Sequence, residues 1–202
     1  MRIIAGSFKG RRLTTPRGDV TRPTADQVRI ALMDTLMPWL PQARFLDLFA
    51  GAGGVGLEAL SRGAAHATFV ERDARAVAAL RANVDALGVG DLTRVLRGDA
   101  VAELDHLARV GERFGLVFLD PPYGAGAVDA TLARLGAGDV TAPGALVIAQ
   151  HFTKRAPAPS AGALTAFRAR RFGETTLTFF RSGGYDAPTL SATPDEAPDR
   201  ED

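Results

Sequence analysis

The sequence predicts an α/β protein built on a doubly wound, mostly parallel sheet, and three observations predict it. Short apolar runs alternate with helical patterns through the middle of the chain. A glycine-rich turn follows the first of these runs, and a proline-rich turn follows the fourth. Alternating strand and helix patterns are typical of βαβ units. The length of 202 residues suits one such domain with short extensions.

Five apolar runs are the predicted strands of the parallel part of the sheet. They lie at Arg44–Phe49, Ala67–Glu71, Thr93–Arg97, Leu116–Leu119 and Ala145–Ala149.

Helical patterns separate these strands. The clearest begins after Asp73, a favourable N-cap, and ends at Gly88, which can adopt the left-handed conformation of a helix C-terminus. Shorter helices are predicted at Gly54–Arg62, Val101–Ala108 and Val128–Leu135.

The chain after the fifth strand has a different pattern. His151–Ala163 contains two prolines and a glycine, which favours a loop over another crossover helix. Leu164–Phe172 and Thr175–Arg181 are then expected to form an antiparallel hairpin at the edge of the sheet.

Before the sheet, Met1–Ala5 and Arg11–Thr14 are expected to pair as a small basic hairpin. A helix follows, with Thr24 as its predicted cap and Pro38 at its end. The predicted organisation is therefore an N-terminal hairpin and helix over residues 1–40, a sheet domain over 41–182, and a disordered acidic tail over 183–202.

The composition excludes several classes of site and partner. The chain has no cysteine, so it forms no disulfide, cysteine-ligated zinc site or thiolate nucleophile. No apolar run approaches the roughly 20 residues of a membrane span. We expect a cytoplasmic protein that binds no metal.

The formal net charge of +1 hides an uneven distribution. Residues 1–29 hold seven basic and two acidic side chains, and residues 151–182 hold six and one. Residues 183–202 hold one basic and six acidic side chains. Two basic flanks suggest a polyanionic partner, and ordinary solvated surface is the alternative.

The glycine-rich turn predicts a nucleotide-type cofactor. Gly51, Gly53 and Gly56 fit G-x-G-x-x-G between a strand and a helix, and Glu71 ends the next strand. In such turns the ligand approaches the backbone, and the acid binds ribose hydroxyls. This pattern suits both NAD and S-adenosylmethionine (SAM). Asp47 favours SAM, because a carboxylate there would repel a pyrophosphate and attract an ammonium group.

Asp99 follows the third strand, where an acid could accept a hydrogen bond from an adenine amino group. Each acid also has a purely structural alternative. Asp99 could cap the following helix, and Asp47 could be a buried aspartate whose hydrogen bonds are satisfied within the fold.

The turn Asp120-Pro-Pro-Tyr123 after the fourth strand predicts an amine-binding site. Two prolines remove two N–H donors, so the turn offers the Asp120 carboxylate and free carbonyl oxygens. Asp120 and the Pro121 carbonyl could hold both N–H groups of an exocyclic amine and orient its lone pair toward a methyl donor. Tyr123 supplies a flat face for a base drawn out of its stack.

Together these motifs resemble class I SAM-dependent amino-methyltransferases. More closely, three blocks of the sequence resemble the RsmD family of bacterial methyltransferases, which act on guanine N2 of small-subunit ribosomal RNA. The blocks are Arg22–Arg29, Phe49–Gly63 and Arg171–Thr175. The resemblance covers about residues 1–182. It implies a Rossmann-like fold with a seven-stranded sheet that ends in an antiparallel hairpin.

The resemblance also implies roles for individual residues and a partner. The substrate is expected to be 16S ribosomal RNA within an assembling small subunit, bound by a monomer. The implied catalytic residues are Asp120, Pro121 and Tyr123. The implied SAM-binding residues are Asp47, Phe49, Gly51, Gly53, Glu71, Arg72, Asp99 and Ala100. The implied RNA-binding residues are Arg11, Arg12, Arg22, Thr24, Arg29 and Arg171.

Two positions depart from the family pattern. Ile30 stands where a glutamate is usual, and Gln150 stands where a glutamate is common. Alternatives also stay open. The turn at Asp120 would serve adenine N6 in DNA or a protein glutamine equally well. An NAD-dependent oxidoreductase and a non-catalytic RNA-binding protein are less favoured by the motifs.

Overall fold

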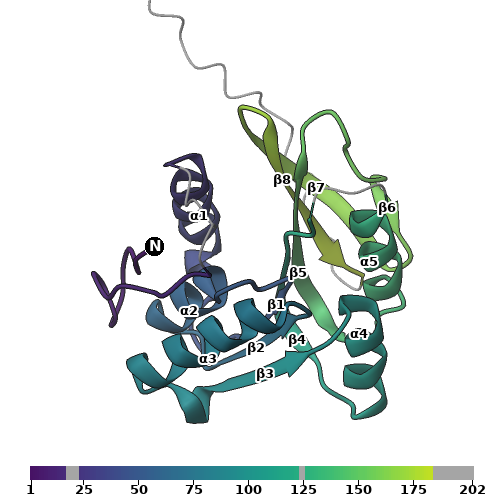
Figure 1. The fold of residues 1–202 in the computed structure, drawn as a ribbon. Helices are drawn as coiled ribbons and strands as arrows, with labels where there is room; N and C mark the ends of the chain where they lie inside the picture. The colour runs from purple at the N-terminus through teal and green to yellow at the C-terminus, as the bar shows by residue number, and fades with distance from the viewer. Residues whose placement is uncertain (17–22, 123–125, 184–202) are drawn as a thin grey trace, which may run out of the picture.

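The computed structural model describes residues 1–16, 23–122 and 126–183, and they form one mixed sheet with helices on both faces (Figure 1). The eight strands lie in the order β3-β2-β1-β4-β5-β8-β7-β6. Strands β1 to β5 are parallel, and β8, β7 and β6 continue the sheet antiparallel. The strands are β1 (Arg44–Leu48), β2 (His66–Glu71), β3 (Thr93–Arg97), β4 (Phe114–Leu119), β5 (Thr141–Phe152), β6 (Ser160–Ala161), β7 (Leu164–Phe172) and β8 (Thr175–Ser182).

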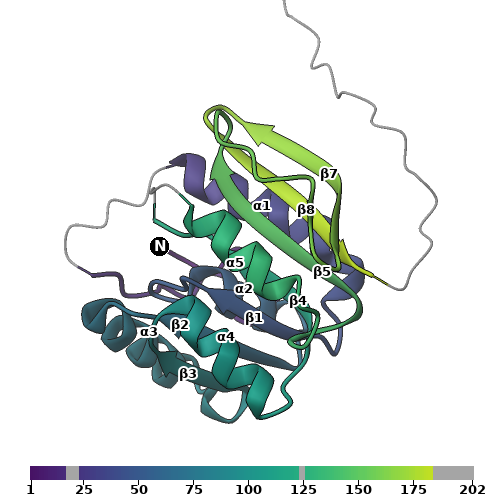
Figure 2. The same cartoon turned by 90° about the vertical axis from the view of Figure 1, so that its right-hand side faces the viewer.

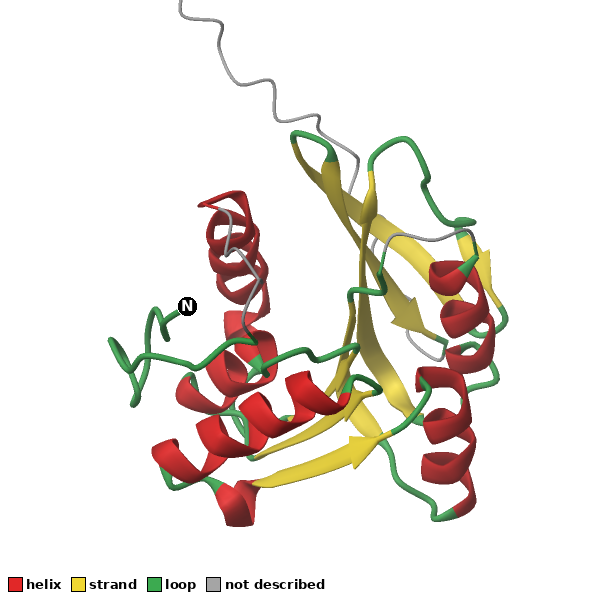
Figure 3. Cartoon of the chain, in the orientation of Figure 1, coloured by secondary structure: helices red, strands yellow, loops and turns green. Residues whose placement is uncertain are grey.

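The helices divide between the two faces of the sheet (Figures 2 and 3). Helices α1, α2 and α3 share one buried cluster with Phe45, Phe69 and Phe118 of the strands. Helices α4 and α5 share a second cluster with Leu48 and Leu119 on the other face. The helices are α1 (Pro23–Leu36), α2 (Gly54–Ser61), α3 (Ala74–Leu87), α4 (Ala100–Arg109) and α5 (Ala127–Leu135), with short 3₁₀ turns at Met37–Trp39 and Gly90–Leu92.

The predicted fold class is confirmed, with eight strands in place of seven. The additional strand is β6, whose two residues pair with β7 inside the segment predicted as a loop. Strand β5 is also longer than predicted, because Thr141 pairs with β4 before the predicted strand and residues 150–152 pair with β8 after it.

Helix α1 begins at Pro23, so the prediction that Thr24 caps it is wrong. Proline is favourable at the first position of a helix because its missing N–H has no intrahelical partner there. The predicted acidic tail lies almost wholly outside the described residues. No helix in the described part of the chain combines the length and apolar character needed to span a membrane.

The first sixteen residues, which we call the N-terminal segment, fold back on themselves. Arg2 and Arg12 form an antiparallel bridge, and the N–H of Leu13 donates to the carbonyl of Met1 at 3.0 Å. Ile3 and Leu13 are buried in the same cluster as Leu36 and Leu40. The division at residue 40 therefore stays a prediction.

A buried carboxylate attaches the N-terminal segment to α2. The Glu58 side chain is fully buried, and it accepts the N–H groups of Ile4 and Ala5 at 2.8 and 2.9 Å. Glu58 also pairs with Arg62, whose guanidinium reaches Asp34 on α1 at 3.0 Å. Glu58 thus binds the N-terminal segment directly, and through Arg62 it is connected to α1.

Replacing Glu58 by alanine should destabilise the protein, because two backbone N–H groups and the Arg62 guanidinium lose a buried acceptor. We expect the free energy of unfolding in urea to fall by about 3 kcal/mol. The N-terminal segment should also become sensitive to protease. Glu174→Ala, which removes an exposed side chain in a hairpin turn, is the matched control. Equal stability of the two variants would contradict the role given to Glu58.

Candidate active site

The carboxyl ends of the parallel strands form the candidate active site. The strand order reverses between β1 and β4, and open α/β sheets bind ligands at such a switch point. Each parallel strand brings one polar residue to this edge. These residues are Asp47 on β1, Glu71 on β2, Asp99 after β3, Asp120 after β4 and Gln150 on β5.

The glycine-rich turn has a strained backbone. Phe49, Gly51 and Gly53 all have positive φ, at 64°, 54° and 85°. Positive φ is unfavourable for Phe49, the one residue of the three that is not glycine. Residues strained in this way are common at ligand-binding sites. A Cβ atom on Gly51 would meet no described atom within 4 Å, so the space beside this residue is open. A Cβ atom on Gly56 would lie 2.3 Å from the Phe69 ring, so glycine permits α2 to approach the sheet.

Glu71 organises this turn. Its Oε2 accepts the Gly51 N–H at 2.9 Å, and its Oε1 accepts the Asp73 N–H at 2.8 Å. The carboxylate is half-buried beside the turn. An acid at this position is able to accept ribose hydroxyls.

Asp47 is almost completely buried, with 1% of its surface exposed. Its Oδ2 accepts the Gly56 N–H at 2.8 Å. Burial, with a smaller contribution from the neighbouring carboxylates of Asp120 and Glu71, raises the pKa of Asp47 to about 7, against the opposing effect of that hydrogen bond. Asp120 and Glu71 are therefore close enough to influence the Asp47 carboxylate.

Asp99 and Ala100, the residues predicted to bind adenine, lie at the start of α4. Asp99 caps α4, accepting the Val101 and Ala102 N–H groups at 3.0 and 3.3 Å, as the structural alternative for this residue supposed. Both bonds reach Oδ1. Ala100 is buried at the start of α4, and Arg72 is exposed after β2.

Asp120 is half-buried at the end of β4, and burial raises its pKa to about 7. Its Oδ2 accepts the Nε2–H of Gln150 at 3.0 Å. Pro121 is buried and Pro122 is exposed beside it. Tyr123 lies outside the described residues, so its predicted role as a flat face for the base is untested.

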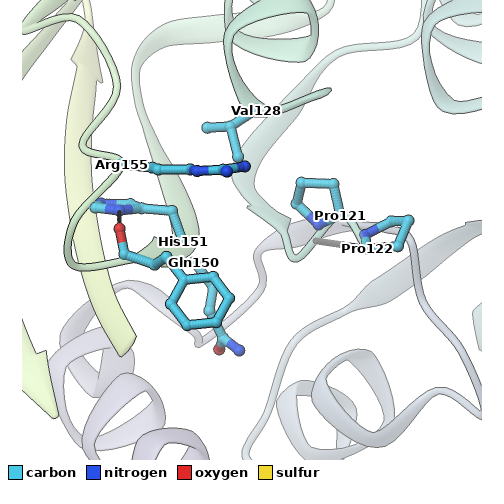
Figure 4. A pocket seen from close by; sticks show the side chains of 7 residues that line it. Pro121, Pro122, Val128, Gln150, His151 and Arg155 are labelled. Atoms are coloured by element: carbon cyan, nitrogen blue, oxygen red, sulfur yellow. Dashed lines mark hydrogen bonds between the residues drawn. The ribbon is translucent and has the colours of Figure 1, made fainter. Parts of the chain in front are cut away.

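A pocket opens next to this turn, between the ends of β4 and β5 (Figure 4). Two prolines form one side of it, and Arg155 and Val128 approach from the other. The lining residues are Pro121, Pro122, Val128, Gln150, His151, Phe152 and Arg155.

His151 is buried and both of its ring nitrogens are bonded within the fold. Nδ1 lies 2.8 Å from the Phe152 carbonyl oxygen, and Nε2 lies 2.8 Å from the Thr178 hydroxyl. The histidine therefore stabilises the junction of β5 and β8. No group of three His, Asp or Glu side chains in the described residues could hold a metal ion.

The predicted RNA-binding residues differ in how exposed their side chains are. Arg11, Arg12 and Arg171 are exposed. Arg29 is only 6% exposed, and its guanidinium binds the Arg2 carbonyl at 2.9 Å and the Asp26 carboxylate at 3.0 Å.

The expectation that Arg29 contacts RNA is therefore corrected, because its side chain is enclosed and supports the N-terminal segment. Arg22 and the side chain of Thr24 lie outside the described residues.

Both basic flanks border the candidate site. The side-chain amide of Asn83 donates to the carbonyls of Thr14 and of Ala52 in the glycine-rich turn, at 2.9 Å each. At the other flank, Phe152 pairs with Thr175, so the turn of the C-terminal hairpin lies at the carboxyl end of β5.

Sequence reasoning missed the roles of Arg155 and Gln150. In the sequence, Arg155 is one charge of a basic flank and carries no further signal. Gln150 differs from the family pattern, but its place after the predicted fifth strand corresponds to that of Asp120 after the fourth.

Comparison with known proteins gives consistent results. The family described as "Conserved hypothetical protein 95" matches residues 1–181. "Putative rRNA methyltransferase YlbH" of Bacillus subtilis is 35% identical over 184 residues, 91% of this chain and 100% of that protein. "Ribosomal RNA small subunit methyltransferase D" of Escherichia coli is 41% identical over 132 residues, 65% of each chain.

Among solved structures, "Putative methyltransferase yhhF from Escherichia coli" is 32% identical, with a TM-score of 0.80. The match covers 92% of this chain and 99% of that one. The family match spans nearly all of the described residues, and it includes the glycine-rich turn, the turn at Asp120 and the C-terminal hairpin. This chain therefore belongs to the RsmD family.

Proposed function

We propose that this protein is a SAM-dependent methyltransferase that modifies the exocyclic N2 of a guanine in small-subunit ribosomal RNA. The observation that carries the proposal is the Asp120 carboxylate beside two prolines, at the edge of a pocket and next to a glycine-rich turn. This arrangement offers acceptors to an amine and few competing donors.

The described residues fit the cofactor. The open space beside Gly51 permits a ligand to approach the backbone, and Glu71 stands where ribose hydroxyls are bound in such folds. Asp47 and Phe49 lie at the end of β1, where Asp47 would favour the ammonium of the methionine part. Asp99, Ala100 and Arg72 lie where the adenine part would bind. When bound, SAM supplies a methyl group activated by its sulfonium.

Asp120 acts on the substrate amine. Its Oδ1 and the Pro121 carbonyl accept the two N–H groups, which orients the nitrogen lone pair for an in-line attack. After transfer the nitrogen carries an additional proton, and the Asp120 carboxylate is able to accept it. Burial favours this step, because a carboxylate whose pKa is about 7 is a better proton acceptor than an exposed one.

The exposed arginines on both sides of the site would bind RNA phosphates. Arg2, Arg11 and Arg12 belong to the N-terminal segment, and Arg155 and Arg171 belong to the β5–β8 region. A monomer would then present basic side chains on both sides of the candidate site. Two relatives of this chain are named as ribosomal RNA methyltransferases, one of them as a putative one. These names favour ribosomal RNA over DNA adenine or protein glutamine as the substrate.

Replacing Asp120 by alanine should lower methyl transfer at least 100-fold while SAM still binds, because the amine loses its acceptor and the glycine-rich turn is untouched. Transfer is measured with labelled SAM and undermethylated small ribosomal subunits, followed by digestion to nucleosides. SAM binding is measured by calorimetry.

Asp129→Ala removes an exposed carboxylate on α5 and should transfer methyl groups normally. If Asp120→Ala retained near-normal turnover, the assignment of the amine site would be wrong. If N6-methyladenosine or a methylated protein were the product, the substrate proposal would fail while the cofactor proposal stood.

Replacing Arg12 or Arg171 by alanine should weaken RNA binding and reduce the slope of log K against log salt. Each lost phosphate contact should lower the slope by about 0.7 to 0.9. Binding is measured by fluorescence anisotropy between 50 and 200 mM salt, a range in which phosphate contacts dominate. Arg109→Ala, at the far end of α4, should leave the slope unchanged. Equal slopes for all three variants would contradict the proposed RNA surface.

A further inference from the structure

Asp120 follows a parallel strand, as Asp73 and Asp99 do, but the hydrogen-bond donor to its carboxylate is of a different kind. Asp73 and Asp99 each accept N–H groups of the residues two and three positions later. The residue two positions after Asp120 is Pro122, and Pro121 precedes it. Neither proline has an N–H group. The residue three positions later, Tyr123, lies outside the described residues. Among the described residues, the Asp120 carboxylate therefore takes its donor from another strand.

Gln150 is that donor. Its Nε2–H reaches Asp120 Oδ2 at 3.0 Å, and among the described residues no other group donates to this carboxylate. The pairing follows from the sheet register. Leu119 of β4 stands beside Ala149 of β5, so the next residue on each strand comes to the same point of the edge.

The backbone that carries Gln150 is held in the sheet. Gln150 pairs with Leu177 of β8, and the next residue, His151, pairs with Thr176. The His151 ring is buried and bonded on both nitrogens, as described above. The amide of Gln150 is therefore presented to Asp120 from a fixed position.

An amide suits this position because it does not titrate. The charged groups near Asp120 in the described residues come from three strands. Asp47 is on the adjacent strand β1, and Glu71 is on β2, next to β1. Arg155 follows β5 and lines the pocket. A second carboxylate in place of Gln150 would share a proton with Asp120, because two close like charges disfavour ionisation.

We propose that Gln150 is a positioning residue, whose amide N–H occupies Asp120 Oδ2 and leaves Oδ1 to accept the substrate amine. The part concerning the amine rests on the proposed function. The part concerning the Asp120 carboxylate does not, so the two are tested separately.

The first test uses the protein without cofactor or RNA. Asp120 is titrated by NMR in protein labelled with ¹³C at the aspartate carboxyl carbon, and its signal is assigned from Asp120→Asn. In Gln150→Met the side chain keeps its length but loses the N–H group. The titration midpoint of Asp120 should rise by about one pH unit, because the ionised form loses a hydrogen bond.

Gln42→Met is the matched control, since Gln42 is exposed on the loop before β1, near the opposite end of the strand. It should leave the Asp120 midpoint unchanged. An equal midpoint in Gln150→Met and in the natural protein would overturn the proposal, whatever the enzyme methylates. Melting curves confirm that each variant is folded.

The second test compares turnover with cofactor and RNA at several pH values. Gln150→Met should lower kcat about tenfold at neutral pH, the loss expected for one hydrogen bond, with SAM affinity unchanged. In Gln150→Glu the new carboxyl group can donate only while it holds a proton. Turnover of Gln150→Glu should therefore fall as pH rises above neutral, where the natural protein stays active.

A purely structural role for Gln150 would lower turnover of both variants at every pH alike, and that result would overturn the positioning role. Failure of the natural protein to methylate ribosomal RNA would instead count against the proposed function, and the NMR titration would still decide the role of Gln150.

Discussion

The buried Glu58 carboxylate is the interaction on which the arrangement of the site depends. It binds two N–H groups of the N-terminal segment and the Arg62 guanidinium, which in turn reaches α1. Helix α2, which carries Glu58, begins directly at the glycine-rich turn. A buried charge is costly unless it is paired, so the segment and both helices are held in one relative position. The glycine-rich turn and the basic N-terminal segment are thereby connected through α2.

The carboxyl edge of the sheet uses its acids in two ways. Asp47, Glu71 and Asp99 accept backbone N–H groups and so hold α2, the glycine-rich turn and the start of α4 in place. Asp120 has no such backbone donor nearby in the described residues, because two prolines follow it, and it accepts an amide side chain instead. Acidic side chains therefore support the edge at three strands, whereas at the fourth the Asp120 carboxylate accepts the Gln150 amide. Pro121 and Pro122 contribute to this difference because they have no N–H group.

Local patterns predicted much of this fold. The strand Thr93–Arg97 and the helix between Asp73 and Gly88 have their predicted bounds, because alternation and capping are properties of a few neighbouring residues. Strand β6 was missed because two residues carry no pattern, and they pair only where β7 is already in place. Arg29 is predicted to bind RNA as part of a basic flank, whereas the fold buries it against the Arg2 carbonyl and Asp26. Gln150 acquires its role only through the register of β4 and β5, which no single segment encodes.

The attachment of the N-terminal segment also has a consequence for the order of folding. Its N–H groups at Ile4, Ala5 and Phe8 bind Glu58 and Ser61, more than fifty residues later in the chain. Closing so long a loop is entropically unfavourable until α2 has formed against the sheet. During synthesis this stretch is therefore a free, positively charged peptide, and it docks late. Until it docks, its basic side chains are available to any polyanion, including ribosomal RNA, so nonspecific capture of this segment competes with its docking onto α2.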